Sequence, residues 1–367
     1  MRLFKHIFKA AFPIGIVLCC LMVNSCGKNG FGSRYGKIKC RVSSVSTKGT
    51  VITTDNIKSS PYGTFTLSAY ALEEYTDPDY NKHAAGQYFT TGVSYDSASE
   101  SWLLASEQLW ISQVPITFWS VAPVSVPNRY IDYAGSEIAG ELKFDYELPV
   151  HTSANDDATA QDDLIFAWNE EERDFSAGKN PSDFIDIHFY HALSQVRFAV
   201  SAVNEGYDAD GTFSDRFEIR DITLGNVASS GSGRAIAGTP LDFEWTSLGE
   251  PASFTQTYNA NFSDTEDRNV SGWTAGTMKR GSDYYGLYTC TNVFFLFPQD
   301  FSENKATLTV TFYDTLAAAT IVRSVELDDK WDAGYYYTYK INFSAGDPLT
   351  LGIQLVDWDV IDVDMEF

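Results

Sequence analysis

The alternation of apolar and polar residues along the chain predicts a protein built from β-strands. In FIDIHFYH, residues 184–191, every second residue is apolar, and the alternation restarts on the opposite parity at Val196, Phe198 and Val200. A period of two residues is that of a strand with one buried face. The stretch 184–200 therefore predicts two strands that meet near HALS, residues 191–194.

The same period recurs in short segments, and no long segment holds the 3.6-residue apolar period of a helix. The predicted strands lie at residues 35–45, 63–72, 88–95, 101–104, 116–121, 142–146, 217–227, 242–245, 286–297, 306–313, 321–327 and 335–343. The 25 Phe, 21 Tyr and 8 Trp of the chain also favour strands. Short strands separated by Pro, Gly, Asp and Asn predict β-sandwiches rather than parallel α/β units.

A length of 367 residues allows two domains, each with its own core. The boundary is predicted at residues 169–182, where a charged run is followed by a Gly/Pro-rich run typical of a linker. The predicted organisation is a leader at 1–25, a tether at 26–34, a first β-sandwich domain at 35–175, a second at 183–348 and a C-terminal strand segment at 349–367.

The leader predicts export as a lipoprotein. It has a basic start and an apolar run from Ala10 to Val23 that is too short for a comfortable membrane span. The run ends in VNSC, residues 23–26, which predicts that Cys26 receives the lipid. Plain secretion with an incidental Cys26 is the alternative. Of the cysteines that follow, Cys40 and Cys290 either form a disulfide in an oxidising envelope or lie separately as buried thiols.

The charge and the motifs exclude several classes of function. The formal net charge is −23, or about −26 without the three basic residues of the leader, which disfavours nucleic acid and anionic lipid as partners. The chain has no nucleophile elbow, zinc-binding helix motif, phosphate loop or dinucleotide fingerprint. We therefore predict a protein that is not an enzyme and has no cofactor or metal site.

A few polar residues are candidates for catalysis or metal binding. His188 and His191 form a close pair, but the sequence names no partner for metal or acid–base work, so a structural role at the strand junction is favoured. The acidic pairs Asp156-Asp157 and Asp162-Asp163 are interpreted as solvated loop carboxylates. The DADG at residues 208–211 begins like a calcium loop but lacks the later ligands, so it is interpreted as a turn.

Six motifs occur in order along most of the chain. They are FWSVAP (118–123), DDLIFAW (162–168), HALSQVRF (191–198), IRDITLGNV (219–227), FFLFPQ (294–299) and WDAGYYYTYKINF (331–343). This ordered set resembles the fimbrillin-like proteins of Bacteroidetes. The resemblance implies two sandwiches of transthyretin-like topology in a lipoprotein precursor that builds or anchors pili at the cell outer membrane. It also implies other fimbrillin subunits as partners.

The resemblance extends to maturation of the first strand. In that family a protease removes the first strand by cutting after an arginine. The matching position here holds Lys48, whereas Arg41 lies inside the predicted strand, so the site of a cut is left open between them. The strand that would be displaced carries Ile38, Cys40 and Val42 toward the core.

The C-terminal segment 349–367 predicts a bent strand with one acidic face, and it either pairs within its own subunit or is donated to another. Its alternation changes phase twice, and each change predicts a bulge or bend. The apolar residues of this candidate donor strand are Leu349, Leu351, Ile353, Leu355, Trp358, Val360, Ile361, Val363, Met365 and Phe367.

Two hypotheses of function follow. The first is a fimbrial subunit or pilus anchor that assembles by strand exchange, with a host or bacterial surface ligand as a further partner. The second is an outer-membrane lipoprotein that binds glycans as a monomer and keeps its C-terminal strand in its own chain. Exposed aromatics such as Tyr284-Tyr285 or residues 335–337 would stack on sugars, although such residues more often fill a β core and its rim.

Overall fold

The computed structural model describes residues 35–45, 56–59, 62–77, 79–124, 129–132, 140–148, 161–175, 181–202, 217–261, 273–275, 288–290, 294–314, 316–343 and 350–357. Within these ranges the regular structure is β-strand apart from one 3-10 turn, η1 (Asn56–Lys58). The predicted all-β class is therefore confirmed, and each predicted strand has a counterpart. No helix among these residues is long and apolar enough to cross a membrane.

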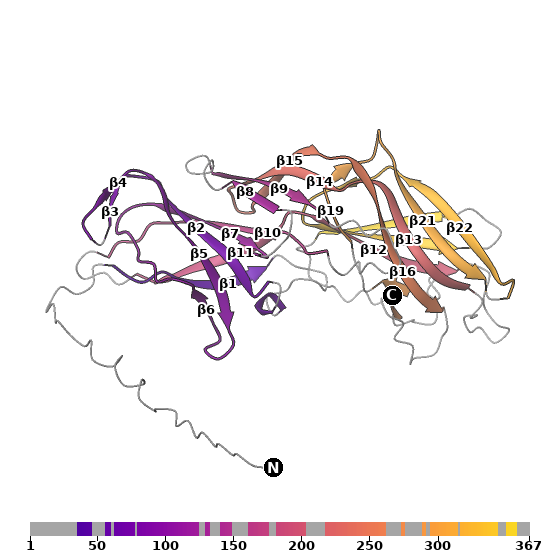
Figure 1. Ribbon diagram of the computed structural model, residues 1–367, viewed down its shortest axis with the longest axis horizontal. Helices are drawn as coiled ribbons and strands as arrows, with labels where there is room; N and C mark the ends of the chain where they lie inside the picture. The colour runs from indigo at the N-terminus through magenta and orange to yellow at the C-terminus, as the bar shows by residue number, and fades with distance from the viewer. Residues whose placement is uncertain are drawn as a thin grey trace, which may run out of the picture. The chain divides into compact units, whose positions relative to one another are not determined.

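One sheet closes on itself in the order β1-β11-β10-β7-β2-β5-β6 (Figure 1). Its strands are β1 (Lys39–Val45), β2 (Thr64–Ala71), β5 (Gly86–Asp96), β6 (Ser101–Leu104), β7 (Ile116–Ala122), β10 (Ile165–Glu171) and β11 (Phe184–His191). β1 and β11 run parallel, and the other neighbours run antiparallel. A closed sheet stands where the sequence predicted a sandwich, and the transthyretin-like topology stays a prediction.

The remaining strands form three larger sheets and two short pairs. The first sheet holds β17 (Trp273–Ala275), β18 (Tyr288–Cys290), β12 (Ser194–Ala202), β24 (Tyr335–Phe343), β25 (Thr350–Asp357) and β19 (Phe294–Leu296). The second holds β16 (Pro251–Asn261), β13 (Phe217–Ala228), β21 (Ala306–Asp314) and β22 (Ala319–Leu327). The third holds β15 (Asp242–Leu248), β14 (Ser230–Ile236), β9 (Glu141–Glu147) and β8 (Arg129–Asp132). The pairs are β20 (Gln299–Asp300) with β23 (Lys330–Trp331) and β3 (Tyr75–Thr76) with β4 (Lys82–His83).

Two clusters of buried side chains make the core, and β7 contributes to both. Phe118 belongs to the cluster inside the closed sheet, whereas Trp119 and Val121 belong to the cluster shared with the strands that follow β11. Every residue of β7 is buried. A strand covered on both faces has a continuous apolar run instead of an alternation, which explains why ITFWSVA contains so few polar residues.

Strand pairing crosses the predicted domain boundary. β11 follows the predicted linker, yet it pairs with β1 and β10 in the closed sheet. β9 precedes the linker, yet it pairs with β14. Residues 169–171, expected in the linker, complete β10 and pair with β7. The division into 35–175 and 183–348 stays a prediction, and hydrogen-bonded sheets join the residues on its two sides.

Candidate strand-exchange site

The first strand lies in the closed sheet between a long ladder and a single contact. On one side β1 pairs with β11 from Lys39↔Phe184 to Val45↔Phe189, with a register shift between Val42 and Ser44. On the other side β1 meets β6 at one residue pair, Cys40↔Trp102. The contact between β1 and β6 closes the sheet, and it has fewer paired residues than any other contact between neighbouring strands of this sheet. We call the site that β1 fills, between β11 on one side and β6 with residues 107–110 on the other, the β1 groove.

Residues 36–39, at the start of β1, form backbone hydrogen bonds with both walls of the β1 groove. Ile38 N donates to Gln108 O at 2.8 Å, and Trp110 N donates to Gly36 O at 2.9 Å. Lys39 N donates to Asp183 O at 2.9 Å. An extended segment in this groove therefore gains backbone partners on both sides at its start and mainly on the β11 side afterwards.

The inner face of β1 is apolar, as predicted. Ile38 and Cys40 are buried, and the half-buried Val42 packs against the same cluster, which also holds Ile185, Ile187 and Trp102. Burial raises the pKa of the Cys40 thiol to about 12. A thiol with so high a pKa is a poor nucleophile at neutral pH, so Cys40 acts as a small core residue.

Cys40 is a buried free thiol in the structure. The two cysteines lie on strands of different sheets, because Cys40 is on β1 and Cys290 ends β18. The alternative reading, a separate buried thiol, holds for Cys40. The side chain of Cys290 lies outside the described residues.

Of the two candidate cleavage positions, Arg41 is in β1 and Lys48 lies outside the described residues. Arg41 pairs with Asp186 in the ladder to β11. Its Nε and Nη2 also donate to the two carboxylate oxygens of Asp186, at 2.6 and 3.0 Å. A protease binds its substrate as an unpaired extended chain, so a cut after Arg41 requires β1 to open first.

The start of the C-terminal segment pairs within its own chain. β25 forms an antiparallel ladder with β24 from Asn342↔Thr350 to Tyr335↔Asp357 without a register shift. Leu351, Ile353 and Leu355 belong to this ladder, but their side chains lie outside the described residues. Leu349, before β25, lies wholly outside the described residues, as do the six candidate donor residues beyond β25, which are Trp358, Val360, Ile361, Val363, Met365 and Phe367.

Sequence reasoning missed the partner of His191. His191 Nδ1 is bound to a carboxylate oxygen of Asp163, and both side chains have no exposed surface. Asp163 was expected to be a solvated loop carboxylate, and that expectation is wrong, since it is fully buried next to β10. Burial raises the pKa of Asp163, while the interaction with His191 opposes the rise. The structural role expected for the histidine pair therefore fits His191, whereas His188 is half-buried beside the ring of Tyr190.

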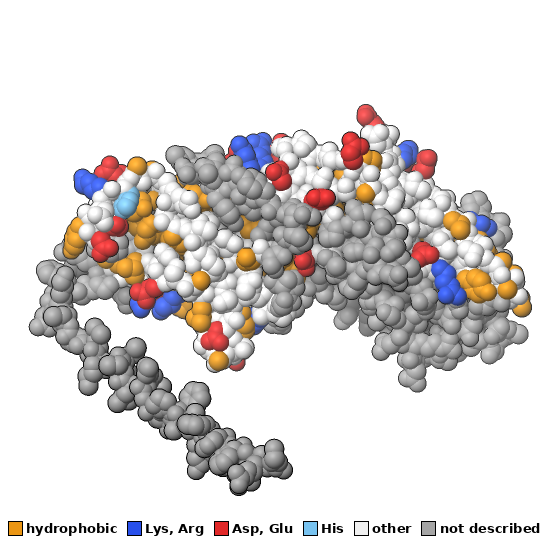
Figure 2. Space-filling view, in the orientation of Figure 1, with side chains coloured by type: hydrophobic (Ala, Val, Ile, Leu, Met, Phe, Trp, Pro, Cys, Tyr) orange, Lys and Arg blue, Asp and Glu red, His pale blue; other side chains and the backbone are white. Residues whose placement is uncertain are grey.

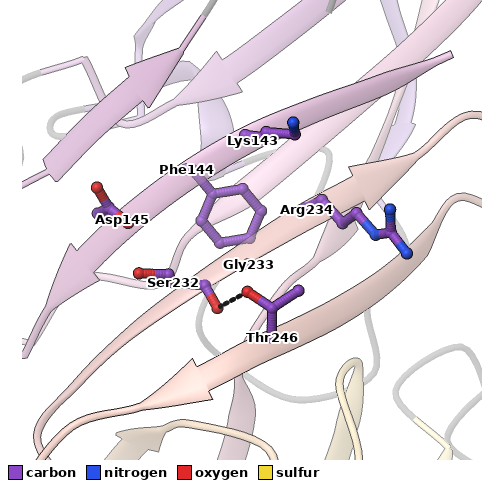
Figure 3. Close-up of a pocket in the computed structure, with 7 residues that line it drawn as sticks. All are labelled: Lys143, Phe144, Asp145, Ser232, Gly233, Arg234 and Thr246. Atoms are coloured by element: carbon purple, nitrogen blue, oxygen red, sulfur yellow. Dashed lines mark hydrogen bonds between the residues drawn. The ribbon is translucent and has the colours of Figure 1, made fainter. Parts of the chain in front are cut away.

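A shallow hollow of about 310 Å³ lies over β9, β14 and β15 and was not expected from the sequence (Figure 3). Its lining residues are Lys143, Phe144, Asp145, Ser232, Gly233, Arg234 and Thr246. The guanidinium of Arg234 forms ion pairs with Glu141 and Glu244, at 2.9 and 2.5 Å. The ring of Phe144 is buried. The hollow therefore presents no exposed aromatic face on which a sugar ring would stack.

The aromatic residues 335–337 also do not form an exposed platform. Tyr336 and Tyr337 are buried, and Tyr335 is half-buried. Tyr284 and Tyr285 lie outside the described residues. Among the residues that the structure describes, no group of three or more His, Cys, Asp or Glu side chains is placed to hold a metal ion.

Figure 2 shows acidic and basic side chains on one face of the molecule, some side by side and others apart. At the β1 groove, basic residues on the outer face of β1 pair with carboxylates. Lys37 Nζ lies 2.5 Å from Glu107 Oε2, and Lys39 Nζ lies 3.3 Å from Asp183 Oδ2. The hydrogen bond from Arg41 lowers the pKa of Asp186. The outer face of β1 is thus basic, and the rim of its groove is acidic.

Comparison with known proteins identifies a family model and several structures. The model described as fimbrillin-like matches residues 66–358. A candidate cell adhesion protein from Bacteroides ovatus is similar at 15% identity and a TM-score of 0.50, over 89% of this chain and 99% of that one. One from Bacteroides uniformis is 14% identical, with a TM-score of 0.45 over 89% and 99% of the two chains. A search of curated protein sequences gave no match.

The tip fimbrial protein Mfa3 from Porphyromonas gingivalis, truncated at its C-terminus, is also similar in structure. It is 7% identical, with a TM-score of 0.40, and the match covers 81% of this chain and 94% of that one. At these identities, the likeness to the Bacteroides ovatus protein shows a shared fold and nothing finer.

Proposed function

Because this chain belongs to the fimbrillin-like family, we propose that it is a fimbrial subunit or pilus anchor that assembles at the cell surface by strand exchange. Family membership supports the coarser statement, a fimbrial or adhesive role without enzymatic chemistry. The observation that carries the finer proposal is the position of β1, which closes its sheet through one residue pair with β6.

The energetics favour exchange only after β1 has been cut from the chain. Burying Ile38, Cys40 and part of Val42 stabilises β1 by ~1.5–3 kcal/mol for each fully buried side chain. Ordering the strand costs ~1–2 kcal/mol per residue. Over the seven residues of β1 the ordering cost exceeds this burial term, so backbone hydrogen bonds and the covalent link, which keeps β1 at a high effective concentration beside its groove, help to hold it in place. Once the link is cut, an incoming strand competes with β1 on equal terms.

An incoming strand gains what β1 gives up. It pairs with the backbone N–H and C=O groups of β11 and covers the apolar residues beneath, in the manner of strand addition to an open sheet edge. The C-terminal segment 349–367 is the part of this chain that we propose as a donor to a neighbour. Its first part, β25, is held by β24 at its edge of the sheet, a place from which a strand can be continued into another subunit.

We also propose that Cys26 carries the lipid that anchors the protein to the outer membrane. Each buried methylene of an acyl chain contributes ~0.8 kcal/mol, so several chains hold a protein firmly. Cys26→Ala should move the protein from the membrane fraction into the soluble fraction in a detergent phase-separation assay. A variant that still partitions with the membrane contradicts the anchor.

The assembly proposal is tested by size-exclusion chromatography of the full chain, alone and mixed with other fimbrillin subunits, before and after limited proteolysis. We expect polymers only after proteolysis, loss of polymers on deletion of 349–367, and loss of cleavage-dependent assembly when the residue that is cut, Lys48 or Arg41, is changed to alanine. Lys39→Ala is the matched control for Arg41→Ala, because it removes one ion pair of β1 without touching a candidate cut site. Polymers that persist in the tail deletion refute donation by the tail.

A second candidate function is a lipoprotein that binds glycans as a monomer. It is favoured by the pairing of β25 with β24 in its own chain. The two candidates differ in the same chromatography: the monomeric protein stays monomeric after proteolysis. A protein that never polymerises but shows saturable binding on a glycan array would favour the second candidate.

A further inference from the structure

The outer face of β1 and its groove form a matched set of charges. Lys37, Lys39 and Arg41 are the outward residues at alternate positions, and each makes an ion pair with a carboxylate of another segment. The carboxylates belong to Glu107, Asp183 and Asp186. All three pairs link β1 to a wall of the groove, so the carboxylates remain in place when β1 leaves.

An aromatic ring completes this set. Phe184 has 39% of its surface exposed, and Lys39 Nζ and the guanidinium carbon of Arg41 lie 5.4 and 5.8 Å from the centre of its ring. The face of an aromatic ring attracts cations. We call Glu107, Asp183, Phe184 and Asp186 the acidic rim. Arg173 is the cation near Asp186, and its own charge is paired with Glu171 at 3.0 Å.

The groove also selects for size at its start. A Cβ atom added to Gly36 would collide with the ring of Phe175 and lie 2.6 Å from Asp183 Oδ1. An occupant in the same register therefore fits without displacing these side chains only if it has glycine there, followed by alternating basic and apolar residues. In β1 this pattern is read as GKIKCRV, residues 36–42.

The C-terminal segment of this chain has the opposite charge. Residues 349–367 contain the five acidic residues Asp357, Asp359, Asp362, Asp364 and Glu366 and no basic residue. Placed along the acidic rim, such a strand brings like charges together, which disfavours pairing. Rejection of a wrong partner by repulsion is a common source of specificity.

From this complementarity we propose that the β1 groove accepts a strand with basic residues at alternate outward positions, supplied by a different subunit, and rejects the acidic C-terminal segment of a second copy. The proposal rests on the proposed function and adds the chemistry of the partner. It makes the assembly a heteropolymer at this groove, in which the next subunit has a basic donor strand. The tail of this chain then enters a groove of another kind.

The exposure of the ion pairs sets how much more tightly the groove should bind a basic strand than an acidic one. The paired side chains keep between 33% and 61% of their surface exposed, so each pair changes affinity only modestly, on the order of two- to fivefold at low salt. Three such pairs give a preference on the order of 10- to 100-fold. Salt screens exposed charges over about 10 Å at 0.1 M, so the preference should shrink as salt is added.

The test uses the full chain, with a recognition site for a specific protease inserted between residues 46 and 55 so that β1 can be cut free without removing it. Three labelled peptides then compete with β1, and fluorescence anisotropy measures their affinity at low and high salt. The first is the β1 peptide, residues 35–45 with Cys40→Ser. The second is the same peptide with Lys37→Glu, Lys39→Glu and Arg41→Glu. The third is the tail peptide, residues 349–367.

We expect the β1 peptide to bind at least tenfold more tightly than the other two at low salt, with the difference reduced at high salt. The matched control is the protein with Glu107→Gln, Asp183→Asn and Asp186→Asn, which should lose most of the preference. Equal binding of all three peptides overturns the proposed selectivity while leaving strand exchange intact. If no peptide enters, including that of β1 itself, the groove does not exchange, and both this inference and the proposed function at this groove fall.

Discussion

Among the described strands, two neighbouring pairs run parallel, β1 with β11 and β24 with β12, and they are held in different ways. β24 pairs with β12 from Gln195↔Tyr336 to Ala202↔Phe343 without a register shift, and β25 covers its other edge. The β1 ladder contains a shift, and the other edge of β1 touches β6 at one pair. The same type of pairing therefore gives one strand locked inside a sheet and one that closes a sheet loosely, which fits release of β1.

The largest loss of stability is expected for a substitution at His191. This residue ends β11 just before β12 begins, so it lies where the two parallel pairs are joined along the chain. His191→Ala leaves the buried Asp163 carboxylate without the histidine, and loss of one partner of a buried ion pair costs about 3–5 kcal/mol. Denaturant unfolding should show this loss of stability. The control is His191→Leu with Asp163→Leu, which leaves no buried charge and should lose less than the single variant.

The pH dependence of the same variant has a definite sign. Burial raises the folded-state pKa of Asp163, so its contribution is fully present below the unfolded pKa of about 3.9 and is lost as pH rises through the raised value. Without His191 the pKa rises further. The stability deficit of His191→Ala should therefore be larger at neutral pH than at about pH 4, and an equal deficit at both values would contradict the ion-pair account.

A smaller loss of stability is expected when one buried isoleucine in or beside each parallel pair is changed to alanine. Ile38→Ala before β1 and Ile341→Ala in β24 both truncate a buried isoleucine, at a cost of about 2–5 kcal/mol. We expect Ile341→Ala to lower global stability, and Ile38→Ala mainly to promote local opening of β1. Amide hydrogen exchange separates the two, since Ile38→Ala should speed exchange in β1 and leave β24 protected. Uniform loss of protection in both strands would contradict the comparison.

The smallest effect concerns the rim of the β1 groove. Because Arg41 lowers the pKa of Asp186, the contribution of Asp186 is present above the unfolded pKa of about 3.9 and is lost as pH falls through the lowered value. Opening of β1 should thus increase on the order of two- to fivefold in acid. Asp186→Asn should abolish this pH step in hydrogen exchange, whereas the control Asp96→Asn, whose carboxylate bonds only within its own turn, should retain it.

Local pattern was enough to predict strands such as β2, β6 and β21, because their alternation is complete within each strand. It failed for β14, whose SGSGRAI is poor in strand-forming residues. This strand forms because its glycines leave room: a Cβ on Gly231 would lie 3.0 Å from the ring of Trp245, and one on Gly233 would lie 3.2 Å from that of Phe144. The sequence analysis predicted no strand at residues 230–236, because small residues carry no apolar alternation even where packing from neighbouring strands favours them.

In the candidate site, too, some residues could be predicted from the sequence and others could not. The inward residues Ile38 and Cys40 were predictable from alternation, whereas the partner of Arg41 was not, since Asp186 is 145 residues away in the sequence. The link from Asp163 to His191 likewise depends on the antiparallel pairing of β10 with β11. Side-chain period is a local property, but the identity of a charge partner is set by which strands the fold brings together.

The central claim is that β1 leaves its groove when subunits assemble, and mass spectrometry of assembled subunits tests it most directly. Polymers formed after proteolysis of the full chain mixed with other fimbrillin subunits would be purified and denatured, and mass spectrometry would show whether the cleaved N-terminal fragment, which contains Lys39 and Arg41 of β1, is still present. The account predicts that assembled subunits lack this fragment, while unassembled cut monomers retain it. Polymers that keep β1 in every subunit would contradict the account.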